Sequence, residues 1–176
     1  MGYVHDTAMS KFVPPTLFGF SAGTWTLAVA SNVWSYNRTA ADASFTLYMP
    51  VLIPSNSVAL KGSYLKSIEL MYSISTAAAD DFVAATCALY LDTLQASAAS
   101  GSGTLNTAAI STGTLDTGHD AAAELKAIDE HRLVWSLTTP AWIDNDQAYH
   151  FEAVVDAAAG TVFKLFGGII NYTFRI

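Results

Sequence analysis

The chain has 176 residues, enough for one domain whose core is large enough to fold without disulfides. Its net charge is −7 and its eight Lys and Arg residues are scattered, which excludes nucleic acid as the expected partner. Apolar residues make up 52% of the chain and charged residues only 13%, yet no stretch reaches about 18 consecutive apolar residues, so we expect no membrane span.

Residues 1–20 are predicted to form an N-terminal arm that precedes a single domain at 21–176. Pro14 and Pro15 interrupt this arm, which also lacks the basic region and the unbroken apolar core of a signal peptide. No signal peptide is therefore recognisable.

Residues 19–23 read GFSAG, a formal match to the G-x-S-x-G nucleophile elbow of serine hydrolases. That elbow requires a buried strand before the serine and a helix after it. Here the strand-forming segment TWTLAV follows directly. We therefore interpret Ser21 as a turn residue and expect no catalytic site and no enzyme activity.

Alternation of apolar and polar residues with period two predicts strands along most of the chain. In one of them Ile68, Leu70, Tyr72 and Ile74 share a face. In the last, Val162, Phe166, Ile170, Tyr172, Phe174 and Ile176 are predicted to share a face, and Gly167-Gly168 suggests a bulge or sharp bend. The predicted strands lie at 24–30, 33–38, 44–52, 64–75, 82–92, 131–138, 147–156 and 161–176.

The small polar residues at 95–118 predict a long loop with one strand near 107–112. One short helix is expected around 120–130, with Asp116 or Asp120 as its N-cap and with Leu125 and Ile128 on one face. The fold class that follows is all-β: an antiparallel β-sandwich, jelly-roll-like, with at most this one short helix.

Four aromatic residues in or beside predicted strands are the candidate functional residues: Trp25, Trp34, Tyr36 and Trp142. Exposed Trp and Tyr rings can stack on the apolar face of a sugar. The same residue types also fill cores and subunit interfaces, where aromatic side chains are enriched. The sequence leaves both interpretations open.

Metal and cofactor sites are not expected. His150 and Glu152 share a strand face and could ligate zinc, but the alternation more simply describes a polar strand face. The acidic pairs at 80–81 and 144–146 could attract calcium, but Asp and Asn are ordinary turn residues. Cys87, the sole cysteine, lies in an apolar run and is interpreted as a small buried hydrophobic residue.

Three segments within residues 44–176 resemble the jelly-roll modules of virion and phage particles, and uncharacterised metagenomic β-sandwich proteins: SFTLYMPVLIPSNSVALKGSYLKSIELMYSI, ATCALYLDTL and HRLVWSLTTPAWIDNDQAYHFEAVV. The resemblance implies a non-enzymatic structural subunit that forms a homo-oligomer, most often a trimer, in a virion or extracellular setting. A carbohydrate-binding module is the alternative. An enzyme that uses Ser21, or His150 with Glu152, is the third hypothesis.

Overall fold

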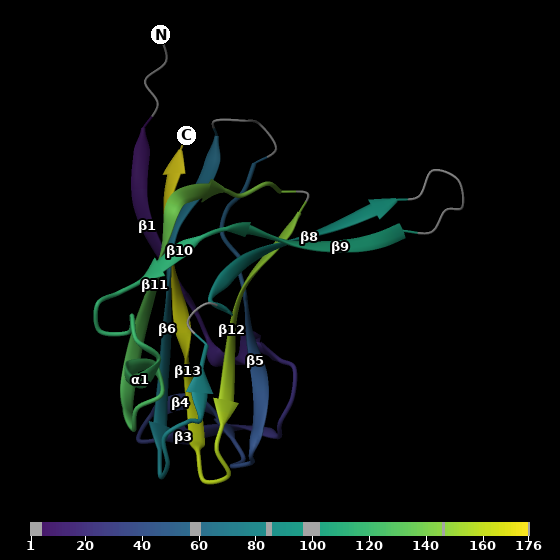
Figure 1. The fold of residues 1–176 in the computed structure, drawn as a ribbon. Coiled ribbons are helices and arrows are strands. Elements are labelled where there is room, and N and C mark those ends of the chain that lie inside the picture. Colours follow the sequence, from purple (N-terminus) through teal and green to yellow (C-terminus); the bar gives the residue numbers. More distant parts are fainter. Residues whose placement is uncertain (1–4, 57–60, 84–85, 97–102, 146, 176) are drawn as a thin grey trace.

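The computed structural model describes residues 5–56, 61–83, 86–96, 103–145 and 147–175. Its strands form two antiparallel sheets packed face to face (Figure 1), which confirms the predicted all-β sandwich. The elements are β1 Asp6–Val13, 3-10 helix η1 Pro15–Leu17, β2 Gly19–Phe20, β3 Trp25–Ala30, β4 Val33–Arg38, β5 Ala43–Pro50, β6 Gly62–Ser75, β7 Asp81–Phe82, β8 Ala88–Ala96, β9 Gly103–Ser111, β10 Gly113–Leu115, α1 Ala122–Leu125, β11 Asp129–Trp142, β12 Ala148–Ala157 and β13 Val162–Arg175.

The order of the strands is that of a jelly roll. Among the described residues, sheet A runs β10-β11-β6-β13-β4-β3, and β1 also pairs with β13. Sheet B runs β2-β5-β12-β8-β9, and β7 also pairs with β12. Reduced to the principal strands, sheet A is β1-β13-β6-β11 and sheet B is β5-β12-β8-β9, two interlocked Greek keys.

The core lies between the two sheets and follows the predicted alternation. Leu133, Trp135 and Leu137 of β11 point inward, as expected from the sequence. The Trp135 ring meets Phe151 of sheet B with 5.3 Å between the ring centroids, so the two sheets interdigitate through large aromatic side chains.

Strand β13 carries the bulge that the paired glycines indicated. Its pairing with β6 shifts between Leu165 and Gly167, which leaves Phe166 as an extra residue. Gly167 has φ +129°, and a Cβ there would lie 2.6 Å from Val13 O, so only glycine fits. The predicted shared face was wrong at Val162 and Phe166 because the bulge reverses the parity: Phe163 and Leu165 are buried before it, and Ile170 and Tyr172 after it. Ile176 lies outside the described residues.

The same bulge marks a change of neighbour along β13. Before it, Lys164 and Leu165 pair with β4, and after it, residues 168–175 pair with β1. Strand β13 is therefore central in sheet A, with β6 on one side and with β4 and β1 in succession on the other. Figure 1 shows the start of β1 and the end of β13 at the same pole.

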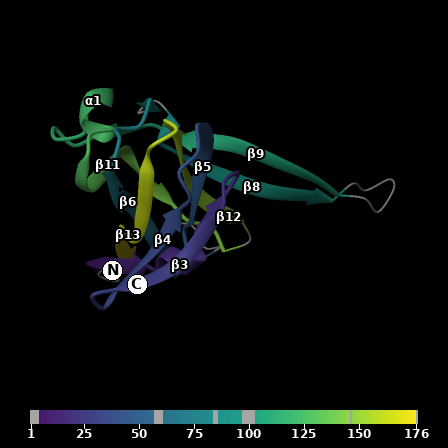
Figure 2. The ribbon, with the colours of Figure 1, turned by 90° about the horizontal axis from the view of Figure 1, so that it is seen from below.

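Strands β8 and β9 form a hairpin that projects beyond the sandwich (Figures 1 and 2). The sequence predicted a loop at 95–118 with a short strand near 107–112, whereas β9 spans Gly103–Ser111 and β10 follows it. This segment is rich in Thr, Ala and Ser, so it lacks the large alternating apolar residues that reveal other strands.

The short helix is present but begins later than predicted. Helix α1 starts after Ala121, whose N–H donates to Glu124 Oε2 at 3.1 Å, so the predicted N-caps Asp116 and Asp120 were wrong. Leu125 is buried, whereas Ile128 is exposed. Within the described segments, no helix is long and apolar enough to cross a membrane.

Candidate ligand-binding site

An apolar cavity of about 460 Å³ opens beside the bulge of β13. Strand β4 pairs with β13 at Tyr36 and Asn37. The part of β4 closer to the β3–β4 turn does not pair with the described residues of β13 and lies next to the end of β1. Trp34, on this part of β4, is 55% exposed, and Phe12, on β1, is 52% exposed. The lining residues are Phe12, Pro14, Pro15, Asn32, Val33, Trp34, Met71 and Phe166.

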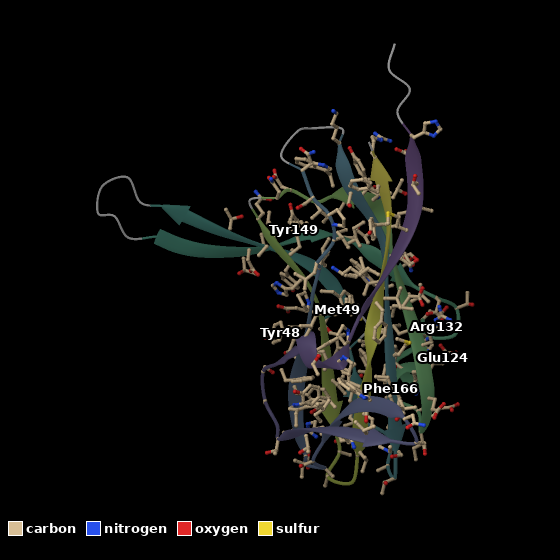
Figure 3. The ribbon with its side chains drawn as sticks, turned by 180° about the vertical axis from the view of Figure 1, so that it is seen from behind. Tyr48, Met49, Glu124, Arg132, Tyr149 and Phe166 are labelled. Carbon is tan, nitrogen blue, oxygen red and sulfur yellow. The ribbon has the colours of Figure 1, made fainter. Side chains whose placement is uncertain are left out.

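A second cavity, of about 640 Å³, continues the first across the outer face of sheet A. The two share Val33, Met71 and Phe166, so we treat them together as the sheet A groove. Phe166 lies beside the β3–β4 hairpin, as Figure 3 shows. The remaining residues of the second cavity are Ala30, Ser35, Asn37, Tyr72, Ser73, Glu130, His131, Arg132 and Lys164.

Polar side chains occupy the part of the sheet A groove away from Trp34. The hydroxyl of Ser35 donates to Asn37 Oδ1 at 2.9 Å, which fixes the orientation of that amide. Lys164 is the strand partner of Asn37 on β13 and brings a cation beside it. The groove thus combines an aromatic end with an end rich in hydrogen-bonding groups.

Arg132, labelled in Figure 3, lines the groove and belongs to a hydrogen-bonded network on the outer face of sheet A. Its Nε donates to Glu69 Oε2 at 2.6 Å, which raises the pKa of the Arg132 guanidinium. Asn171 Nδ2 donates to Glu69 Oε1 at 2.8 Å, and Ser10 Oγ donates to Asn171 Oδ1 at 2.6 Å. Glu69 is only 8% exposed, so this carboxylate is buried with its partners satisfied.

Trp25 and Tyr36, two of the predicted residues, belong to the packing of the sandwich. The Trp25 ring stacks on Phe20 with 3.8 Å between centroids and 14° between planes, and its edge contacts Phe45. Tyr36 also meets Phe20, edge to face, at 5.6 Å. Both rings are half-buried against the core, so their accessible area is small.

Trp142 is also partly buried, and its indole N–H donates to Lys61 O at 2.8 Å. Of the four predicted aromatic residues, only Trp34 lines the sheet A groove. The sequence missed Phe12, which was assigned to an arm, and Phe166, which was predicted to share a face with Ile170 and Tyr172. The paired glycines predicted the bulge, but not that Phe166, before them, is its extra residue.

The residues considered for catalysis or metal binding have other partners. Ser21 Oγ accepts a hydrogen bond from Thr46 N–H at 2.8 Å, and strand β3, not a helix, follows Ser21. His150 Nδ1 lies 2.8 Å from Asp92 Oδ2 and Nε2 lies 2.8 Å from Glu152 Oε1, so both ring nitrogens are engaged.

No group of three or more His, Cys, Asp or Glu side chains suited to a metal ion occurs in the described part of the chain. At the acidic turns, the Asp80 carbonyl accepts from Lys126 Nζ at 2.7 Å and Asp144 Oδ1 accepts from Asn145 N–H at 2.7 Å. Residue 146 of the second turn lies outside the described residues. Cys87 is buried, as predicted, and burial raises the pKa of its thiol to about 12.

Comparison with known proteins gives no family for this chain. No family model and no curated protein matches it. Solved structures that resemble it include an arabinose-bound α-L-arabinofuranosidase of family GH51 (TM-score 0.40, 13% identity, 92% of this chain and 24% of that one). This chain thus spans about a quarter of that enzyme.

Two further structures resemble it over most of both chains. One is a family 61 carbohydrate-binding module in complex with β-1,4-galactotriose (TM-score 0.35, 10% identity, 96% of this chain and 88% of that one). The other is a carbohydrate esterase of the Shiga toxin-encoding bacteriophage phi24B (TM-score 0.33, 12% identity, 89% and 90%).

Proposed function

We propose that this chain is a non-catalytic carbohydrate-binding module that holds its ligand in the sheet A groove. The exposed indole of Trp34 carries the proposal, because a flat aromatic surface open to solvent can stack on the apolar face of a sugar ring. Asn37, Lys164 and Arg132, farther along the groove, supply hydrogen bonds to sugar hydroxyls. Ligand sites commonly combine such an apolar surface with a few placed polar groups.

The experiment is a polysaccharide panel run by affinity electrophoresis with wild type, Trp34→Ala and Ile128→Ala. Ile128 is a matched control, since it is 57% exposed and lines neither cavity. We expect retardation by at least one polysaccharide, a loss of about tenfold or more in affinity for Trp34→Ala, and no change for Ile128→Ala. Equal retardation of all three proteins would contradict the proposal.

Self-association is the second candidate, because the exposed apolar side chains are also suited to burial against another copy. Phe12, Val29, Val33 and Trp34 are all exposed on or beside the β3–β4 hairpin. In this alternative the groove is covered in a homo-oligomer, with a trimer as the predicted state and a virion or extracellular particle as the setting. Light scattering distinguishes the two: a concentration-independent monomer favours sugar binding, and an oligomer that Trp34→Asp dissociates favours assembly.

A further inference from the structure

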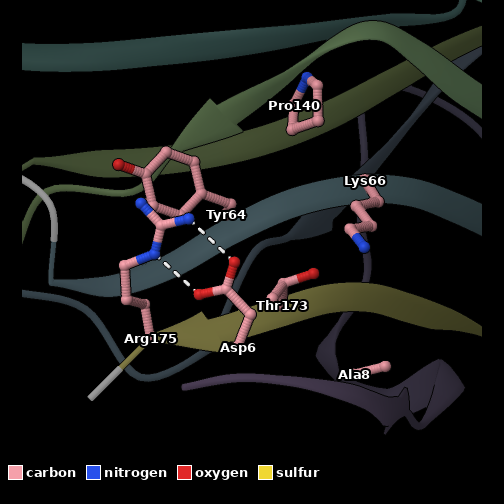
Figure 4. Close-up of a pocket in the computed structure, with 7 residues that line it drawn as sticks. All are labelled: Asp6, Ala8, Tyr64, Lys66, Pro140, Thr173 and Arg175. Atoms are coloured by element: carbon pink, nitrogen blue, oxygen red, sulfur yellow. Dashed lines mark hydrogen bonds and ion pairs between the residues drawn. The ribbon is translucent and has the colours of Figure 1, made fainter. Parts of the chain in front are cut away.

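A separate cavity, of about 280 Å³, lies at the other end of the outer face of sheet A, near the paired ends of β1 and β13. Figure 4 shows its lining, to which β1, β6, β11 and β13 all contribute. It shares no lining residue with the sheet A groove. We refer to it as the terminal cavity.

One wall of the terminal cavity is held rigidly by an ion pair. Arg175 Nε donates to Asp6 Oδ1 at 2.6 Å and Arg175 Nη2 donates to Asp6 Oδ2 at 2.7 Å, a two-point contact. The Arg175 guanidinium also lies over the Tyr64 ring, 5.1 Å from its centroid. These contacts fix three lining side chains in place without a ligand.

Thr173 contributes a hydroxyl that has no partner. The residue is only 7% exposed, and its Oγ1 is buried without a hydrogen bond to any described residue. Leaving a buried polar group unpaired is unfavourable, and such groups in native proteins call for a partner. In Figure 4 this hydroxyl points into the opening toward which Lys66 also extends.

Lys66 is directed into the cavity by an irregularity of β6. On the β13 side, Ser67 pairs with Asn171 and Leu65 pairs with Tyr172, so Lys66 between them is an extra residue. The pairing of β6 with β11 also leaves Lys66 without a partner. Such a bulge re-aims the extra side chain. Lys66 Nζ makes no hydrogen bond or close ion pair with a described residue, although its charge, with that of Arg175, helps to lower the pKa of the Asp6 carboxyl.

We infer that the terminal cavity binds a small carboxylate, either free or carried on a single uronic acid. Its two cations and one carboxylate leave one net positive charge, on a chain whose net charge is −7. A bound carboxylate accepts hydrogen bonds from Lys66 Nζ and, once the side chains that cover Thr173 Oγ1 shift, from this hydroxyl, which has no partner among the described residues. Ala8, Pro140 and the Tyr64 ring form the apolar walls, and the volume limits the ligand to about one sugar ring.

The test is a titration of the isotope-labelled protein by NMR at constant ionic strength, with sodium D-glucuronate, sodium acetate and D-glucose as probes. We expect glucuronate and acetate to shift the amide signals of Ala8, Tyr64, Lys66 and Thr173, and glucose to leave them unchanged. A tighter site for glucuronate than for acetate identifies a uronic acid as the ligand, and equal affinities identify a bare carboxylate.

Variants show whether the site is the one described. Lys66→Gln is expected to weaken binding by about tenfold and Thr173→Val by about threefold or more. Lys61→Gln, which removes the same charge from an exposed position outside the cavity, is expected to bind like wild type. Thermal melting verifies that each variant is folded, and Thr173→Ser, which keeps the hydroxyl, is expected to retain binding.

The inference is overturned if neither carboxylate shifts these signals, if glucose shifts them equally, or if Lys66→Gln binds as tightly as Lys61→Gln. It does not depend on the proposed function, because Trp34→Ala is expected to leave carboxylate binding intact. Failure of polysaccharide binding and failure of carboxylate binding are therefore separate results.

Discussion

Asp116 binds Val134 twice, once through its main chain and once through its side chain. Its N–H donates to Val134 O at 3.0 Å, and its Oδ2 accepts from Val134 N–H at 2.7 Å. The carboxylate thus extends the pairing of β10 with β11 by one hydrogen bond beyond the end of β10. It also accepts from Gly118 N–H at 3.0 Å and faces His119 Nδ1 at 2.9 Å.

These contacts make stability depend on pH through Asp116. Burial raises the pKa of this carboxyl, but the hydrogen bonds from Val134, His119 and Gly118 outweigh burial, so its pKa lies below the ordinary value. A lowered folded-state pKa stabilises the protein above the unfolded value of about 4, and this stabilisation is lost as pH falls toward the folded value. Asp116→Asn should therefore cost about 1–2 kcal/mol at pH 7, and the difference from wild type should shrink below about pH 4.

Urea unfolding between pH 7 and pH 3 measures this difference. Asp120→Asn is the control, because Asp120 is exposed on the same loop. A destabilisation by Asp116→Asn that stays constant across the whole range would show that its carboxylate charge plays no part.

Trp25 and Trp34 should respond differently to the same substitution. Trp25→Ala removes a ring packed on Phe20, Phe45 and the core, and should lower the free energy of unfolding by about 3 kcal/mol. Trp34→Ala removes a mostly exposed ring and should change it by no more than about 0.5 kcal/mol. Guanidinium unfolding of both variants provides the comparison, and a large loss for Trp34→Ala would mean that this ring stabilises the fold.

Cys87 should be inert toward thiol reagents in the folded protein. Burial both blocks access and raises the pKa of the thiol to about 12, so little thiolate forms even at pH 9. We expect an aromatic disulfide reagent to label it fully in 6 M guanidinium and negligibly in native buffer. Rapid stoichiometric labelling of the native protein at pH 8 would contradict the burial of this side chain.

Gly113 should not tolerate a methyl group. An alanine Cβ at this position would lie 2.3 Å from Trp135 Cε2, and Trp135 is buried in the core. Because the indole has no room to move, Gly113→Ala should destabilise the protein by about 1–3 kcal/mol. Gly160→Ala is the control, since its Cβ would make only ordinary contact with Ala77 at 3.4 Å. A thermal-melting shift of equal size in both variants would refute the steric explanation.

The sequence predicted the strands whose buried face carries large side chains. In β12, Tyr149, Phe151, Ala153 and Val155 are all buried, and they alternate with His150, Glu152, Val154 and Asp156. Strand β9 was largely missed because small residues produce no such contrast. The prediction of which residues share a face was wrong in the first half of β13, because one extra residue, Phe166, reverses the alternation. A prediction that assumes strict alternation cannot locate such a residue.

The sequence also identified the right kind of functional residue without locating the site. Trp25 and Trp34 occur in adjacent strands of similar composition, and nothing local distinguishes their exposure. Trp25 is covered because Phe20, from β2, packs on it. Trp34 lies on the part of β4 that precedes the residues paired with β13. The terminal cavity was missed for the same reason, because Lys66 and Thr173 meet only through the pairing of β6 with β13.

The central position of β13 determines when this polypeptide can fold. Until residues 162–175 are available, β1 and the β3–β4 hairpin have no partner in sheet A, and β6 lacks one of its two neighbours. Pairing β1 with β13 also closes a loop that spans nearly the whole chain, which is slow. A nascent chain on the ribosome therefore keeps this edge of β6 uncovered until residues 162–175 have been synthesised and can pair with it. An unpaired strand edge of this kind favours aggregation of the incomplete chain.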